Sequence, residues 1–109
     1  MTKIKVEYTE TAKFSLQEIV NNLKWRQQEP TPVINELLNE FEGKVTVFPL
    51  GCPVSPELVK IGVNRYRECN TSNGYRVIYS VSIDTVTAHV ILSQRQDIQQ
   101  LLFKRLIEA

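Results

Sequence analysis

Four arginines lie within or at the end of one β-rich stretch of the chain, where a plain sheet would carry apolar side chains. They are Arg65, Arg67, Arg76 and Arg95. A guanidinium stays charged and presents a planar set of N–H donors, so several together suit the recognition of phosphates or carboxylates. They would also stabilise the negative charge that develops during metal-independent RNA cleavage, a role that Lys60 could share.

RNA cleavage also requires a base for the 2′-hydroxyl and an acid for the leaving oxygen. Arginine is a poor base because it stays protonated, so the natural candidate is His89, the one histidine in the chain. A lone strand histidine is more often structural, Glu68 alternates away from the arginines, and Tyr79 points toward the expected core. The acid–base pair is therefore incomplete, which favours a protein that is not an enzyme. The catalytic residues of a ribonuclease would be Arg65, Arg67, Arg76, His89 and Arg95.

Some of these side chains also have a structural interpretation. Arg67 and Arg76 could form ion pairs across the sheet. The acidic candidates are Glu57, Glu68 and Asp84. Arg95 ends its strand, so we expect it to be exposed and to take part in recognition. Trp25 and Arg26 end the first helix outside its apolar stripe, which predicts either a contact patch or ordinary packing of the helix against a loop.

Length and composition limit the classes of protein to which the chain can belong. The chain has 109 residues, of which 42% are hydrophobic, and this predicts a single domain over residues 1–109. A formal net charge of +1 argues against binding nucleic acid through bulk charge, so an anionic partner must meet a local patch. The N-terminus lacks a signal peptide and no apolar run reaches membrane-spanning length, which predicts a cytoplasmic protein without a membrane partner.

The cysteines and the histidine match no metal-binding pattern. Cys52 and Cys69 are far apart in the sequence and have no ligand spacing, and one histidine makes a histidine-based site improbable. We therefore expect two reduced thiols that act as packing residues, no metal and no cofactor.

Hydrophobic periodicity predicts a strand followed by two helices. Residues 4–8 alternate apolar and polar side chains, and Thr9 can cap the helix that follows. That helix has one apolar stripe, made by Ala12, Leu16, Ile19, Val20 and Leu23. A break at 27–30 precedes a second helix that starts at Thr31-Pro32 and stops at Gly43. Its stripe comprises Ile34, Leu37, Leu38 and Phe41.

The rest of the chain predicts a loop, three strands and a last helix. Prolines and glycines punctuate residues 48–62, which favours a structured loop. Asn73-Gly74 is a strong hairpin signal, Asp84-Thr85 marks a second turn, and a helix is predicted from Asp97. The order is β-α-α-β-β-β-α. The fold class is therefore α+β, with the αα-hairpin packed on one face of a small, mainly antiparallel sheet.

Alternation assigns the side chains of the last two strands to two faces. The apolar face would hold Tyr75, Val77, Tyr79, Val81, Ile83, Val86, Ala88, Val90 and Leu92. The other face would hold Arg76, Ile78, Ser80, Ser82, Thr87, His89, Ile91, Ser93 and Arg95. Arg65 and Arg67 are expected on this second face as well. Ile78 and Ile91 would then need a cover, either the C-terminal helix or a partner.

This element order, with "YRECNTSNGYRVIYSV" and then "VILSQRQD", resembles the RelE/ParE superfamily of toxins from type II toxin–antitoxin systems. The likeness runs from the first strand through "FPLGCPVSPEL" to Arg95. ParE-like members poison DNA gyrase, whereas RelE-like members are ribosome-dependent mRNA endonucleases. The loop "PLGCPVSPEL", the Arg67-Glu68 pair, Arg76 with Tyr79, and the ending "SQRQD" are closer to the ParE pattern. Cys52 departs from the basic residue common at that place.

The resemblance implies a toxin that inhibits DNA gyrase and forms a hetero-oligomer with a cognate antitoxin that neutralises it. The residues predicted to bind the target or the antitoxin are Arg67, Arg76, Ile78, Ile91, Arg95, Trp25 and Arg26. The alternative is an mRNA endonuclease whose partners are the ribosome and mRNA, although the catalytic tyrosine or histidine of the RelE-type ending is absent. A third possibility is an inactive member that retains only antitoxin binding.

Overall fold

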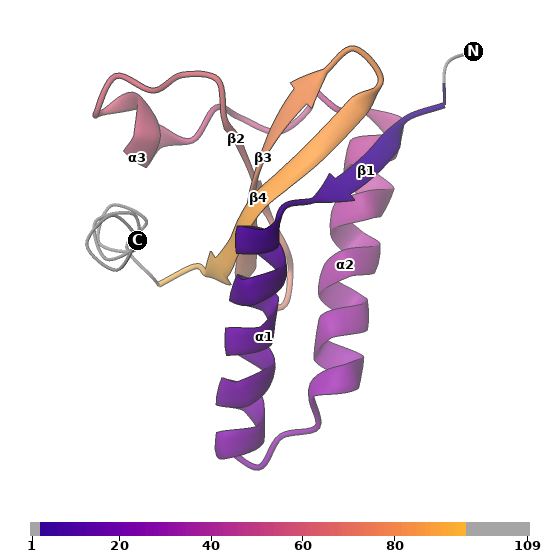
Figure 1. Cartoon of the computed structure of the whole chain (residues 1–109), viewed down its shortest axis with the longest axis vertical. Helices are drawn as coiled ribbons and strands as arrows, with labels where there is room; N and C mark the ends of the chain where they lie inside the picture. Colours follow the sequence, from indigo (N-terminus) through magenta and orange to yellow (C-terminus); the bar gives the residue numbers. More distant parts are fainter. Residues whose placement is uncertain (1–2, 96–109) are drawn as a thin grey trace.

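A four-stranded mixed sheet with a helical hairpin on one face forms the computed structural model, which describes residues 3–95. The strands lie in the order β1-β4-β3-β2; β1 pairs parallel with β4, and the other pairs are antiparallel. The elements are β1 (Lys5–Tyr8), α1 (Glu10–Trp25), α2 (Pro30–Val47), α3 (Pro56–Val59), β2 (Arg67–Asn70), β3 (Tyr75–Ser82) and β4 (Thr85–Ser93). This confirms the predicted α+β class and the hairpin (Figure 1). The predicted C-terminal helix from Asp97 lies outside the described residues.

Helix α1 begins where the sequence indicates. The Thr9 hydroxyl accepts a hydrogen bond of 3.1 Å from the Ala12 amide, so Thr9 is the N-cap. The same hydroxyl donates to the His89 carbonyl at 3.1 Å, which joins the start of the helix to β4. Ala12 and Leu23 are buried along the predicted stripe, and α1 packs on the central strand β4.

Helix α2 is longer than predicted at both ends. It begins at Pro30, with Glu29 as N-cap, and continues past Gly43 to Val47. Phe41 and Val45 are both fully buried, four residues apart on one helix face, so the apolar stripe extends beyond the glycine. A glycine inside a helix costs only about 1 kcal/mol, which the burial of Val45 outweighs. The predicted stop at Gly43 was therefore wrong.

We expect Gly43→Ala to stabilise the protein by roughly 0.5–1 kcal/mol, because alanine loses less backbone entropy in a helix. A methyl group at this position would meet nothing within 4 Å, so it introduces no clash. Urea denaturation measures the change. Gly74→Ala is the matched control: it also has open space, but its φ of +95° disfavours alanine and should make that variant less stable.

A bulge in β4 changes the faces that alternation predicts. Ile78 pairs with Val90 but Tyr79 pairs with Ala88, so His89 is the extra residue. The alternation is correct up to Ala88 and inverts beyond it. Ile91 therefore lies in the core under the helical hairpin, and Val90 lies on the opposite face, the reverse of the prediction.

The turn between β3 and β4 corrects a second assignment. Ile83 was expected on the apolar face, but it occupies the turn with φ of +48° and is 98% exposed. The strand ends at Ser82 and pairing resumes at Thr85, so the two intervening residues make the hairpin connection. Alternation therefore extended β3 one residue too far.

Ile78 has its own cover within the described chain. It is 2% exposed and packs in a second apolar cluster on the face opposite the hairpin. The cluster comprises Leu58, Ile78, Val90 and Leu92, with Val63 and Tyr66 partly buried against it. Leu58 belongs to α3, a short helix within the predicted loop, which starts with proline at its first position as a helix can. Figure 1 shows α3 on the far side of the strands from α2.

The main core lies between the hairpin and the sheet. Phe41 of α2 is its centre: the ring makes edge-to-face contacts with Tyr8 at 6.4 Å and Tyr79 at 5.7 Å between centroids. Both tyrosines keep a hydrogen bond at their polar end, Tyr8 to Glu42 and Tyr79 to the Pro49 carbonyl. Within residues 3–95, neither long helix is apolar over enough of its length to cross a bilayer.

Candidate functional site

Arg76 is a buried structural cation. Its Nη1 donates to Glu57 and, at 3.0 Å, to Glu68, and only 7% of its side chain is exposed. These partners come from α3 and β2, so the guanidinium fixes the short helix to the sheet. The ion-pair interpretation is the one observed for this residue, and Arg76 offers little surface to a partner.

Arg67 lies on the opposite face from Arg76. It pairs with Tyr79 across the strands, which places its side chain on the hairpin side of β2, and the prediction of a shared arginine face was wrong. Its Nη1 donates to the Cys52 carbonyl at 2.6 Å and the Leu50 carbonyl at 3.3 Å. Arg67 therefore holds the segment before α3, and it is partly exposed.

Arg65 and His89 do come together, in a polar cluster on the face away from the hairpin. The Arg65 guanidinium stacks 5.0 Å from the Tyr66 ring centroid and donates to its hydroxyl at 2.7 Å. Tyr66 packs edge-to-face on His89 at 5.0 Å between ring centroids. The Ser80 hydroxyl lies 2.7 Å from His89 Nε2. The bulge in β4 presents the histidine to this cluster.

Burial lowers the pKa of His89 below its ordinary value of 6.5, and the positive charge of Arg65 lowers it further. The imidazole is therefore neutral at pH 7, and it can accept a proton. Sequence reasoning found His89 and Arg65 but missed Tyr66 and Ser80. Ser80 was predicted on the same face as His89, which was the available signal.

We expect the His89 environment to make folding pH-dependent below pH 6.5. The unfolded chain binds a proton at this histidine at a higher pH than the folded chain, so stability is full above 6.5 and falls as the pH drops through that value. Thermal unfolding at pH 7.5 and 5.5 should show a larger loss of Tm in the wild type than in His89→Gln. Equal losses in both proteins would contradict the lowered pKa.

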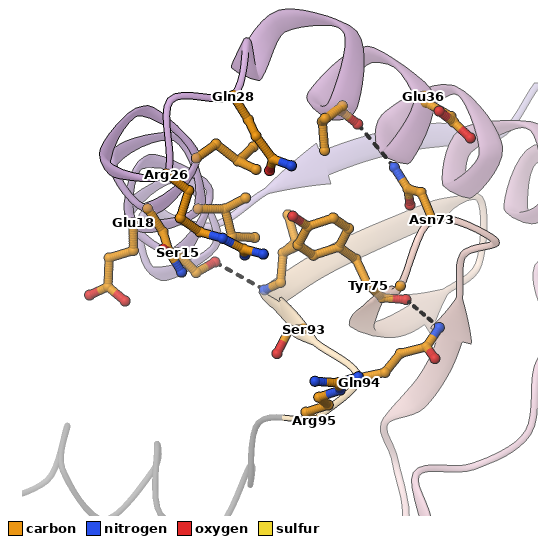
Figure 2. Close-up of a pocket in the computed structure, with 16 residues that line it drawn as sticks. Ser15, Glu18, Arg26, Gln28, Glu36, Asn73, Tyr75, Ser93, Gln94 and Arg95 are labelled. Atoms are coloured by element: carbon orange, nitrogen blue, oxygen red, sulfur yellow. Dashed lines mark hydrogen bonds between the residues drawn. The ribbon is translucent and has the colours of Figure 1, made fainter.

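Arg95, Arg26 and Ile91 line one cleft, which the sequence did not predict. Its volume is about 1010 Å³, and it lies between the C-terminal half of α1 and the ends of β3 and β4. Figure 2 shows Arg26 reaching in from the helix side and Arg95 from the strand side. The acidic lining residues are Glu18 and Glu36.

Hydrogen bonds hold the walls of this cleft. Ser15 Oγ accepts from the Ile91 amide at 3.0 Å, which ties α1 to β4. Asn73 Nδ2 donates to the Val33 carbonyl at 3.2 Å, and Gln94 Nε2 donates to the Tyr75 carbonyl at 3.2 Å (Figure 2). The cleft is therefore a built feature of the fold, with Ile91 as part of its floor.

The remaining predicted residues lie apart from both sites. Trp25 is 86% exposed, so it does not pack against a loop, and it is absent from the lining of the cleft. Lys60 is exposed at the C-cap of α3. The predicted residues thus separate into structural arginines, a histidine cluster, a cleft and an isolated tryptophan.

No protein-family model and no curated protein sequence matches the chain. Solved structures do. The toxin–antitoxin complex RelBE2 from Mycobacterium tuberculosis is similar with a TM-score of 0.62 and 18% identity, covering 88% of this chain and 97% of that chain. The chromosomal ParDE toxin–antitoxin system from P. aeruginosa is similar with a TM-score of 0.66 and 11% identity, covering 84% and 96%.

The chain shares its fold with these two toxin–antitoxin structures. A third structure, the conserved hypothetical protein HP0894 from Helicobacter pylori, is similar with a TM-score of 0.51 and 15% identity, covering 85% of this chain and 97% of that chain. The RelE/ParE fold predicted from the sequence is thereby confirmed. The likenesses to a RelBE and a ParDE protein are comparable, so the fold does not distinguish the two branches.

Proposed function

We propose that the chain is the toxin of a type II toxin–antitoxin system and that a cognate antitoxin neutralises it. The fold supports this proposal, since the similar structures include a RelBE complex and a ParDE system. The antitoxin would occupy the cleft beside α1. Arg26 and Arg95 there can pair with its acidic side chains, and Ile91 forms part of the floor.

We further propose that the toxin acts by binding DNA gyrase, without chemistry of its own. The observation that supports this is that two of the four arginines already have hydrogen-bond partners within the protein. Arg76 is buried between two glutamates and Arg67 donates to backbone carbonyls, so neither is available to cradle a scissile phosphate. Gyrase is a cytoplasmic enzyme, and the cytoplasm is therefore the proposed site of action.

The second candidate function is ribosome-dependent cleavage of mRNA, and the cluster at His89 is the observation that favours it. A neutral imidazole is a suitable general base, and Arg65 could stabilise the developing phosphate charge. The acid for the leaving oxygen would have to be Tyr66, whose hydroxyl is already bonded to Arg65. If the chain cleaves mRNA in this way, cleavage requires both His89 and Arg65.

The deciding experiment compares the purified wild type, His89→Ala and Arg65→Ala in two assays. One is supercoiling of plasmid DNA by gyrase, and the other is translation of a defined message by ribosomes. We expect cleaved plasmid or blocked supercoiling with all three proteins, and intact mRNA. Cuts at codon positions that disappear in His89→Ala, with gyrase unaffected, would replace the proposal with the endonuclease. Inactivity in both assays would overturn both targets and leave only antitoxin binding.

A further inference from the structure

The two cysteines, which are 17 positions apart in the sequence, lie on two segments that an antiparallel bridge joins. The segment before α3 runs alongside the start of β2. Ser55 N donates to the Tyr66 carbonyl at 2.9 Å, and Glu68 N donates to the Pro53 carbonyl at 2.9 Å. Between these bonds, Val54 forms a bridge with Arg67. If this register continues by one residue beyond Pro53, into the bend at Cys52, it brings Cys52 opposite Cys69.

The register also determines whether Cys52 and Cys69 form a hydrogen-bonded or a non-hydrogen-bonded pair. The hydrogen-bonded positions, Ser55 with Tyr66 and Pro53 with Glu68, alternate with the bridge at Val54, so the next pair is of the non-hydrogen-bonded type. Such opposing residues have Cα atoms about 4.5 Å apart, which lies within the span that a disulfide bridges. The two thiols lie close enough for Cys52 to affect the pKa of Cys69.

The two sulfur atoms differ in how far solvent can reach them. Cys52 is partly exposed, whereas Cys69 is fully buried in the main core. Burial is the largest cause that raises the pKa of Cys69 to about 12, and Cys52 adds to it. An oxidant in solution therefore reaches Cys52 first, and Cys69 stands behind it as the resolving thiol.

We propose that Cys52 and Cys69 form a reversible intramolecular disulfide when the protein meets a peroxide. The Cys52 sulfur attacks one peroxide oxygen, the O–O bond breaks, and the departing oxygen leaves as water, so that Cys52 becomes a sulfenic acid. The Cys69 sulfur then attacks the Cys52 sulfur, and the sulfenic oxygen leaves as water with the Cys69 proton. The sum is two thiols and one hydrogen peroxide giving one disulfide and two waters. A dithiol reductant reverses the link.

The link would fasten a segment that carries other contacts. Arg67 donates to the carbonyl of Cys52 itself, and Tyr79 donates to Pro49 three residues earlier. A covalent bond at Cys52 would keep both contacts in place when the chain partly opens. Formation of this disulfide does not depend on which target the protein binds.

Peptide mapping tests the proposal on the full chain. After treatment with stoichiometric hydrogen peroxide and trapping of remaining thiols, a tryptic digest should contain peptide 45–60 joined to peptide 68–76. Reduction with dithiothreitol should remove the joined species. Before reduction, the intact oxidised protein should be 2 Da lighter than the reduced protein. Sulfinic acid at Cys52, Cys52-linked dimers, or two unmodified thiols would each overturn the proposal.

Two controls test the order in which the two thiols react. Before oxidation, a thiol reagent should label Cys52 well ahead of Cys69, and equal labelling would contradict the assigned order. In Cys52→Ser, which alters the partly exposed cysteine and should fold, peroxide should leave Cys69 unmodified.

The disulfide-linked wild type should have a higher Tm than the reduced form, by roughly 5–15 °C for a loop of this length. A lower Tm would show that the native geometry does not accommodate the bond.

Discussion

Arg76→Ala is expected to lower the free energy of unfolding by about 3–5 kcal/mol, because it leaves buried negative charge without its cation. The guanidinium lies between Glu57 and Glu68, and the Glu68 side chain is only 11% exposed. The loss should include the attachment of α3, since Glu57 belongs to that helix. Urea denaturation followed by circular dichroism measures the change.

Arg67→Ala is the control for this prediction, since its guanidinium is partly exposed and bonds to carbonyls in place of carboxylates. We expect a loss of about 1 kcal/mol there. A second variant, Arg76→Met combined with Glu68→Met, removes the buried Glu68 charge together with its cation and should recover part of the stability. An Arg76→Ala protein as stable as the wild type but inactive on its target would refute the structural role.

Phe41→Ala is expected to be the other severe substitution, with a loss of about 3–5 kcal/mol. The side chain is fully buried, and its ring contacts both Tyr8 and Tyr79, so truncation leaves a cavity between α2 and the sheet. The midpoint of urea denaturation should fall while the m-value stays similar.

Phe14→Ala provides the comparison for the same change of side chain. Phe14 lies on α1 with half of its surface exposed, so the loss should be about 1 kcal/mol. Similar losses for the two variants would mean that Phe41 does not form the centre of the core. The m-value of both proteins checks that each still unfolds in one step.

Alternation predicted the faces of β3 correctly from Tyr75 to Ser82, with Val77 and Tyr79 in the main core and Ile78 on the opposite face, although it added Ile83 to the strand. It failed beyond Ala88, where one extra residue in β4 reverses the alternation. Nothing in the residues around His89 marks a bulge, since a bulge is set by how two strands pair. Ile91 therefore changed faces, and with it the interpretation of Ile78 and Ile91 as a shared uncovered surface.

The candidate site depended even more on contacts that are distant in sequence. The types of Arg65 and His89 suggested chemistry, and the structure does bring them together through Tyr66. Arg67 and Arg76 have the same side chain, yet one bonds carbonyls and the other carboxylates. Arg67 pairs with Tyr79, three positions along β3 from Arg76, so the two side chains lie on opposite faces of the sheet. The segment 48–62 was expected as a loop, and only its tertiary contacts reveal that α3 covers the second face.

The position of β4 has a consequence for the protein during its synthesis. The strand lies between β1 and β3, so the first strand of the chain pairs only with the last one that the structure describes. While β4 is still within the ribosome, β1 has no neighbour in the sheet, and β3 lacks the partner on that side. The nascent chain therefore cannot complete its sheet until translation has passed Ser93. A ribosome that stalls earlier would release a chain without the native fold, and such a fragment would be a substrate for proteases.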